Sequence, residues 1–103
     1  MSHRLVIRAE AETDITDAAI WYQNQRRGLG EEFIAEVDAA LKNAVANPRQ
    51  HPRLRRKPDV RRILTKRFPY RIFFVLREDS IVVFRVLHGA RHDHEWKKAV
   101  PAD

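Results

Sequence analysis

The segment VLHGARHDHEW, residues 86–96, places three histidines and two acids within a few positions of one another. Imidazole titrates near neutral pH, so each histidine has the chemistry of a general acid or base. Histidines beside carboxylates also resemble a set of metal ligands, but the chain has no cysteine to complete a typical zinc site. We therefore expect neither a metal nor a cofactor at His88, His92, His94, Asp93 and Glu95. His88 is expected to end a strand and to hydrogen-bond the backbone.

Three arginines near this segment have the chemistry to bind an anion. Side chains alternate between the two faces of a strand, and this alternation puts Arg71 and Arg85 on the sheet face that the helices leave uncovered. Arg91 joins them if the chain stays extended beyond the last strand. Guanidinium groups pair well with phosphate and carboxylate, so the cluster is a candidate target-binding site. The alternative is a structural role, in which Arg71 and Arg85 pair with acids or stack on Phe73.

Two hydrophobic periods define the elements that must position these side chains. A helical period covers residues 12–27 and again residues 33–45, and the glycines within residues 28–30 separate the two helices. Thr13 and Asp14 are expected near the start of the first helix. A short run rich in β-branched and apolar residues predicts a strand at residues 3–8, and a period of two predicts strands at residues 60–66, 70–76 and 81–88. The three prolines within residues 48–59 predict an irregular surface connection.

The resulting order, βααβββ, predicts one α+β domain over residues 1–103. A helical hairpin packed on one face of a mainly antiparallel sheet buries both helical stripes. Residues 77–80 suit the turn between the last two strands. The wholly apolar faces of these strands are expected to meet the helices, namely Ile72, Phe74 and Leu76 with Val82, Phe84 and Val86.

Ile20 and Trp21 do not fit the apolar stripe of the first helix. On a helical wheel centred on Ile15, Trp21 falls outside the apolar face and Ile20 lies nearly opposite it. Large apolar side chains on a surface indicate a partner, either another protein or a second copy of the chain. A tryptophan packed against the neighbouring helix is the simpler alternative.

Charge is distributed unevenly along the 103 residues. Residues 1–47 hold five Lys or Arg against eight Asp or Glu, a net charge of −3, whereas residues 48–103 hold fifteen against six, a net charge of +9. Ten basic residues and a single acid, Asp59, lie between Arg49 and Arg71. This density favours a polyanionic partner such as RNA, DNA or an acidic protein segment, although a solvated basic loop has the same composition.

Composition excludes several classes of protein. Without cysteine there is no disulfide framework and no thiol nucleophile. The longest apolar run, IFFVL at residues 72–76, is far too short to span a bilayer. The charged N-terminus lacks the apolar region of a secretory signal, so we expect a cytoplasmic protein.

Several segments, in this order and spacing, resemble the RelE/ParE superfamily of toxins from bacterial toxin–antitoxin modules. The resemblance extends from about His3 to Trp96 and rests on AIWYQNQRRGLGEEF, RRILTKRFPYRIFFVL and IVVFRVLHGARHDHEW. RFPYRIFF followed by VLHGAR is more similar to the ParE branch and its plasmid-stabilisation relatives than to the RelE branch. The resemblance implies a small toxin that a cognate antitoxin holds inactive by wrapping its helices and sheet, with Ile20 and Trp21 as candidate antitoxin contacts.

The resemblance implies two mechanisms. ParE-like members poison DNA gyrase without hydrolytic chemistry of their own, and Arg71, Arg85 and Arg91 are then candidate target contacts. RelE-like members cleave mRNA on the ribosome, which here would use Arg71 and Arg91 on phosphate with His88 or His92 in proton transfer. RelE-type sites have a tyrosine or a His-Tyr pair near the C-terminus, and this chain has no tyrosine after Tyr70. The gap favours a gyrase poison over an enzyme; a non-toxic basic nucleic-acid-binding module is a third alternative.

Overall fold

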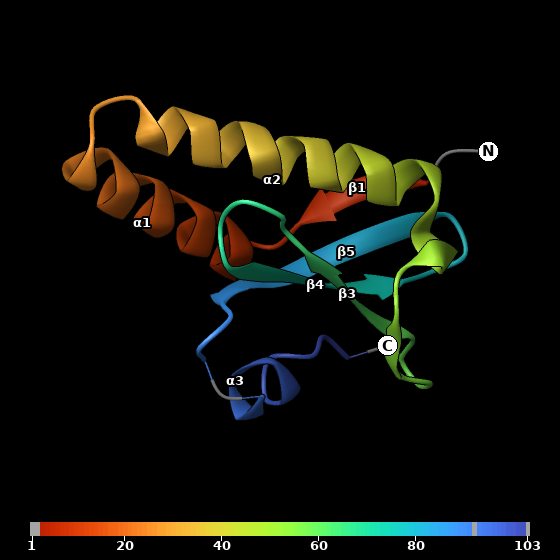
Figure 1. Ribbon diagram of the computed structural model, residues 1–103. Coiled ribbons are helices and arrows are strands. Elements are labelled where there is room, and N and C mark those ends of the chain that lie inside the picture. The colour runs from red at the N-terminus through yellow and green to blue at the C-terminus, as the bar shows by residue number, and fades with distance from the viewer. Residues whose placement is uncertain (1–2, 92, 103) are drawn as a thin grey trace.

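A helical hairpin covers one face of a five-stranded sheet in the computed structural model, which describes residues 3–91 and 93–102 (Figure 1). The strands lie in the order β1-β5-β4-β3-β2, with β1 parallel to β5 and the other neighbours antiparallel. The elements are β1 (Arg4–Ile7), α1 (Ala9–Gln25), α2 (Leu29–Ala46), the 3-10 helix η1 (Pro48–Gln50), β2 (Arg53–Arg55), β3 (Val60–Leu64), β4 (Tyr70–Leu76), β5 (Ser80–His88) and α3 (His94–Lys97). The α+β architecture predicted from the sequence is confirmed.

The two long helices begin earlier than their periodicity predicts. Helix α1 starts at Ala9, directly after β1, so Asp14 lies within the helix and does not cap it. Gly28, with a φ of 90°, occupies the left-handed region at the turn into α2, where a glycine avoids the cost of a Cβ. Gly30 is needed for a different reason: a Cβ there would lie 2.5 Å from the Ala19 carbonyl oxygen, so its absence lets the two helices approach closely.

The connection after α2 is more ordered than its prolines predict. It contains η1 and the short strand β2, which pairs with β3 through Arg53 and Arg55. Arg61, on β3, is buried and holds this region together. Its Nη1 donates to the carbonyls of Arg49 and His51 at 3.1 and 3.0 Å, and its Nε donates to Asp59 at 3.1 Å. Three-residue β2 was too short to stand out as a strand in the sequence.

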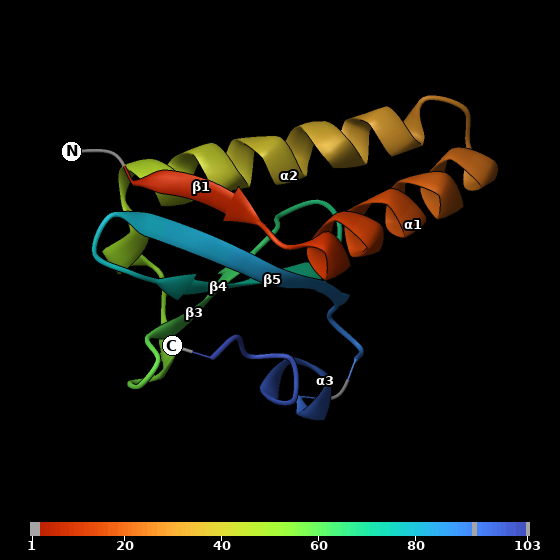
Figure 2. The same ribbon diagram turned by 180° about the vertical axis from the view of Figure 1, so that it is seen from behind.

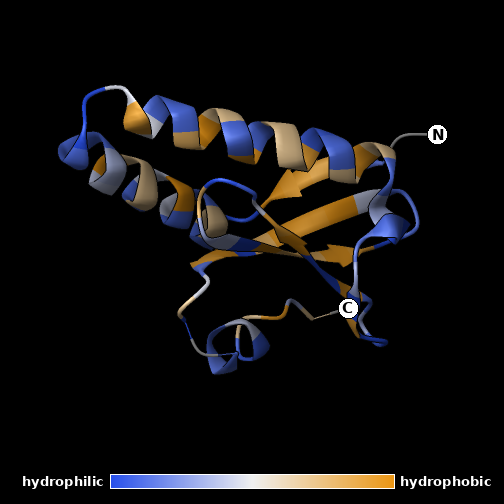
Figure 3. Ribbon diagram, viewed as in Figure 1, coloured by the Kyte–Doolittle hydropathy of each residue, from blue (hydrophilic) through white to orange (hydrophobic). Residues whose placement is uncertain are grey.

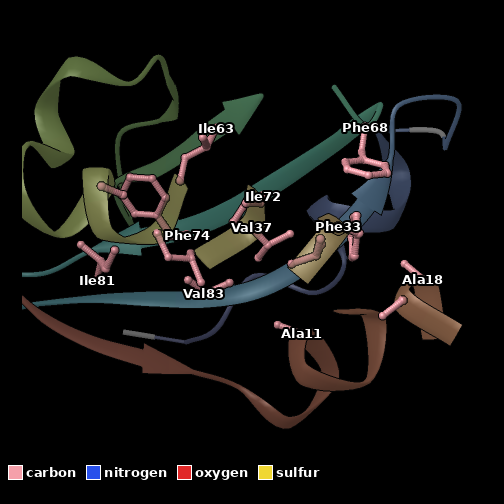
Figure 4. Packing of buried hydrophobic residues seen from close by; sticks show 14 of the residues in the cluster. Ala11, Ala18, Phe33, Val37, Ile63, Phe68, Ile72, Phe74, Ile81 and Val83 are labelled. Carbon is pink, nitrogen blue, oxygen red and sulfur yellow. The ribbon is translucent and has the colours of Figure 1, made fainter. Parts of the chain in front are cut away.

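The helix-facing side of the sheet holds the larger core cluster (Figure 4). Phe33 of α2 lies against Phe68 of the β3–β4 connection with ring centroids 5.4 Å apart, and Phe74 lies further along the sheet, near Ile63 and Ile81. Each fully buried large apolar side chain stabilises the fold by about 2–3 kcal/mol relative to exposure. Figure 3 shows how hydropathy is distributed over the elements: the strands are mainly hydrophobic, and the helices that cover them mix polar and apolar residues.

An extra residue in β5 changes which side chains face the helices. Phe73 pairs with Arg85 but the next residue, Phe74, pairs with Val83, so Phe84 is the additional residue of a β-bulge. Before the bulge Ile81 and Val83 face the helices. The expectation that Val82 and Phe84 do so is therefore wrong, because strict alternation does not survive a bulge; the other members of those sets, Ile72, Phe74, Leu76 and Val86, do belong to the helix-facing cluster.

The second face of the sheet is also covered, contrary to the sequence-based expectation. The chain turns after β5 and forms α3, which lies beneath the sheet on the side away from α1 and α2 (Figure 2). Trp96 of α3 stacks on Phe73 with ring centroids 5.6 Å apart and joins a second cluster with Val60, Val82 and Leu87. Among the described residues, no helix is both long and apolar enough to span a bilayer.

Candidate target-binding site

Arg71 connects the sheet to the segment that follows β5. Its Nη1 donates to Oδ1 of Asp93 at 2.8 Å, and its Nη2 donates to the carbonyl of Arg91 at 2.5 Å. The guanidinium carbon lies 5.3 Å from the centroid of the Phe73 ring, and only 12% of the Arg71 side chain is exposed. These are the contacts of the structural alternative, in which the arginine pairs with an acid and stacks on Phe73. Arg71 therefore fixes the backbone at Arg91.

Arg85 is paired with an acid of the first helix, whereas Arg71 is paired with Asp93. The Arg85 side chain reaches Asp14 of α1, with Nε donating to Oδ2 at 2.7 Å and Nη2 to Oδ1 at 3.0 Å. Oδ2 of Asp14 also accepts from the backbone N–H of Val86 at 2.9 Å. The hydrogen bond and charge of Asp14 raise the pKa of Arg85 despite its partial burial. The expected cluster of Arg71 and Arg85 on an open face is thus replaced by two separate ion pairs.

Arg91 is exposed and lies in the turn that follows β5, not in an extension of the strand. Its backbone N–H donates to the carbonyl of His88 at 2.9 Å. The turn at Gly89 and Ala90 ends the alternation on which the predicted alignment with Arg85 depended. Arg91 still lies next to Arg71, because its carbonyl accepts the Arg71 hydrogen bond.

His88 meets a tyrosine that the sequence analysis did not place here. Tyr70 at the start of β4 pairs with His88 at the end of β5, and the two rings lie edge to face with centroids 5.3 Å apart. Burial raises the pKa of Tyr70, and the Arg91 cation works in the opposite direction. As expected, the His88 ring hydrogen-bonds the backbone, since its Nδ1 accepts from the N–H of Ala90 at 3.0 Å.

The bulge explains why this pairing was missed. A tight turn that sets Leu76 opposite Ile81 would place Tyr70 opposite Leu87 if alternation continued. The extra residue, Phe84, shifts the register by one and brings His88 opposite Tyr70. The end of the sheet thus brings an imidazole into contact with a phenol, and the Arg91 cation lies close enough to act on the phenol.

The remaining histidines give no metal centre in the part of the chain that the structure describes. No three His, Asp or Glu side chains of residues 3–91 and 93–102 lie close enough to hold an ion. His94 lies at the start of α3, and His92 lies outside the described residues. The candidate role of His92 in proton transfer therefore stays a prediction.

Ile20 and Trp21 are exposed on α1, with 55% and 58% of their surface accessible. Ile20 borders a shallow groove of about 300 Å³ between the two helices, and Ile34 of α2, 47% exposed, lines the other side. Trp21 is not part of this groove; its ring lies edge to face on Tyr22 at 5.1 Å. Because neighbouring residues of a helix point about 100° apart, the two side chains belong to adjoining surfaces of α1.

Comparisons with known proteins agree with this architecture. The family model described as "ParE toxin of type II toxin-antitoxin system, parDE" matches residues 5–93. A solved structure from P. aeruginosa, titled "Chromosomal ParDE TA system", is similar with a TM-score of 0.74 and 17% identity, over 84% of this chain and 96% of that one. No curated protein sequence matches the chain. The similarity extends over nearly the whole of the solved chain, so the two proteins share their fold.

Proposed function

Since the chain belongs to the family of ParE toxins of the type II toxin–antitoxin system parDE, we propose that it is a cytoplasmic, single-domain toxin that inhibits growth by poisoning DNA gyrase. The observation that carries the toxin assignment is the family match over residues 5–93, which includes both long helices, the sheet and Arg91. The similar solved structure belongs to a ParDE system, which supports a cognate antitoxin as the partner.

The antitoxin is proposed to cover Ile20 and Trp21 on the helical hairpin. Both side chains are more than half exposed, and the adjacent groove lies between two helices with Ala19 and Gly30 at its floor. Small residues at the floor and large apolar residues at the rim suit an apolar side chain from a partner. Ile20→Ser and Trp21→Ala should each weaken antitoxin binding about tenfold or more, because each removes apolar area from the contact. Titration of labelled antitoxin measures the affinity, and circular dichroism checks the fold.

The target is proposed to contact Arg91 and its surroundings. Arg71 and Arg85 have partners within the chain, whereas Arg91 is exposed in a turn whose backbone Arg71 holds. A binding surface of this kind suits a poison that acts by contact and needs no reaction of its own. Arg91→Ala should therefore reduce growth inhibition, while Arg91→Lys should retain part of it because the charge remains.

The test of the mechanism is expression of the toxin without antitoxin in bacteria. DNA breaks and an SOS response should precede any arrest of translation. Tyr70→Phe, which removes only the phenolic hydroxyl from the end of the sheet, should leave the growth inhibition intact. Cleaved mRNA as the first effect, with cleavage lost in Tyr70→Phe, would contradict gyrase poisoning and assign the toxin an endonuclease mechanism.

A further inference from the structure

The 3-10 helix η1 and the β2–β3 hairpin carry a strongly basic set of exposed side chains. Within residues 49–57 five basic side chains are exposed and no acid occurs, namely Arg49, Arg53, Arg55, Arg56 and Lys57. Asp59, the acid that follows, accepts from Nε and Nη2 of buried Arg61 at 3.1 and 3.3 Å. Its charge is therefore compensated within the hairpin, whereas none of the five exposed cations forms an ion pair with an acid of residues 3–91 and 93–102.

Lys97 of the C-terminal segment adds one further cation to the same region. The guanidinium carbon of Arg55 lies 6.0 Å from the centroid of the Trp96 ring, and Nζ of Lys97 lies 5.9 Å from it. Figures 1 and 2 both show the segment that follows α3 running toward this hairpin, although the two are distant in sequence. We call the exposed side chains of Arg53, Arg55, Arg56, Lys57 and Lys97 the basic surface.

The basic surface is held in place by the core. Arg61 hydrogen-bonds the carbonyls on either side of Gln50, and Leu54 packs against the cluster around Trp96. The cations consequently project from an anchored support, so less conformational entropy is lost when they bind a ligand.

The chemistry of this surface favours phosphate groups. Protein partners are held mainly by apolar side chains at the centre of an interface. The basic surface offers none, because Leu54 is partly buried within the cluster below it. Nucleic acids, in contrast, bind through neutralised phosphates and released counterions, and guanidinium groups match phosphate in shape and charge.

From these observations we propose that the basic surface binds the phosphodiester backbone of a nucleic acid, DNA or RNA, without reading its sequence. The proposal does not depend on the cellular target of the toxin. Binding through about four phosphates predicts that log K falls with log salt at a slope of roughly −3.6 for duplex DNA and −2.8 for a single strand. For duplex DNA the affinity should fall about 150-fold between 50 and 200 mM salt.

The experiment measures fluorescence anisotropy of labelled 20-nucleotide duplex DNA and single-stranded RNA with the full chain at several salt concentrations. Arg55→Gln combined with Arg56→Gln should weaken binding about tenfold at low salt and reduce the slope by roughly 2. The matched control, Arg26→Gln with Arg27→Gln, removes the same charge at the turn between α1 and α2, at the opposite end of the molecule (Figure 1).

The control variant should bind both probes as tightly as the unmodified chain does. Comparing the affinity for duplex DNA with that for single-stranded RNA identifies which nucleic acid the surface prefers. Equal loss in both double variants would overturn the proposal, because net charge alone would then explain binding. Competition by polyglutamate at the same charge concentration would overturn it in favour of an acidic protein segment. Tryptophan fluorescence in a Trp21→Phe background, where Trp96 is the remaining tryptophan, checks that Trp96 stays packed in the variant.

Discussion

The ion pair between Asp14 and Arg85 joins the first helix to the last strand across 71 residues of sequence, and Asp14→Asn tests how much it stabilises the fold. The substituted amide oxygen can still accept from the N–H of Val86. The Arg85 guanidinium, however, loses a charged partner that accepts from two of its nitrogens, at 2.7 and 3.0 Å.

The expected effect follows from burial. The side chains of Arg85 and Asp14 are only 17% and 14% exposed, so water compensates little of the lost contact. Breaking one half of such a partly buried pair costs about 2–4 kcal/mol. In a domain of this size that loss lowers Tm by roughly 10–25 °C.

Urea unfolding followed by circular dichroism measures the change. Combining Asp14→Asn with Arg85→Gln in a double-mutant cycle isolates the pair, and we expect a coupling energy of about 2 kcal/mol. Asp38→Asn is the matched control, since Asp38 is 60% exposed and pairs with Lys42 one turn away. It should cost at most about 0.5 kcal/mol. A loss in Asp14→Asn no larger than that of the control would refute the reasoning.

Two further perturbations test the region around α2. Burial, and then the Arg61 cation, lowers the pKa of His51 below its ordinary 6.5. His51 is therefore protonated more readily in the unfolded chain than in the folded one. Its contribution to stability is complete at pH values above 6.5 and is lost as the pH falls from 6.5 through the lower pKa of the folded state. His51→Gln should flatten the dependence of unfolding free energy on pH in that range, measured by urea titration; an unchanged dependence would be the contrary result. Gly30→Ala places a methyl group 2.5 Å from the Ala19 carbonyl, so the helices must separate. A loss of about 1–3 kcal/mol is expected in thermal unfolding, and full stability would show that the helices adjust freely.

The helical hairpin and the central strands were predictable because local pattern and tertiary packing agree there. The sequence assigns to the core a stripe of α2 with Phe33, Ile34, Val37, Ala40, Leu41, Ala44 and Val45. Phe33, Val37, Leu41 and Ala44 are buried, whereas Ile34 is 47% exposed and that part of the prediction is wrong. β4 occupies the predicted residues 70–76, and β5 ends at the predicted His88. Gly28 takes the left-handed conformation expected of a glycine between two helices.

Elements that depend on distant contacts were not predictable from periodicity. α3 has four residues, too few for a helical repeat, and it is ordered by the packing of Trp96 on Phe73. A lone tryptophan after a polar segment gives no indication of which surface it covers. The exposed side chains Ile20 and Trp21, in contrast, were placed correctly, because their departure from the helical stripe is a local property.

The β-bulge at Phe84 accounts for most of the difference between the expected and the observed site. Phe84 lies within an apolar run, and nothing in that run distinguishes an extra residue from a regular one. Its insertion returns Leu87 to the face covered by Trp96 and sets His88 against Tyr70. Arg85, beside the bulge, lies beyond the end of β1, where the Asp14 carboxylate can reach both its side chain and the Val86 N–H. Strand β1 is too short to pair with β5 at Val86, so the Asp14 carboxylate of α1 accepts the hydrogen bond of the Val86 N–H instead. The same carboxylate pairs with Arg85, which strand alternation alone would have left exposed.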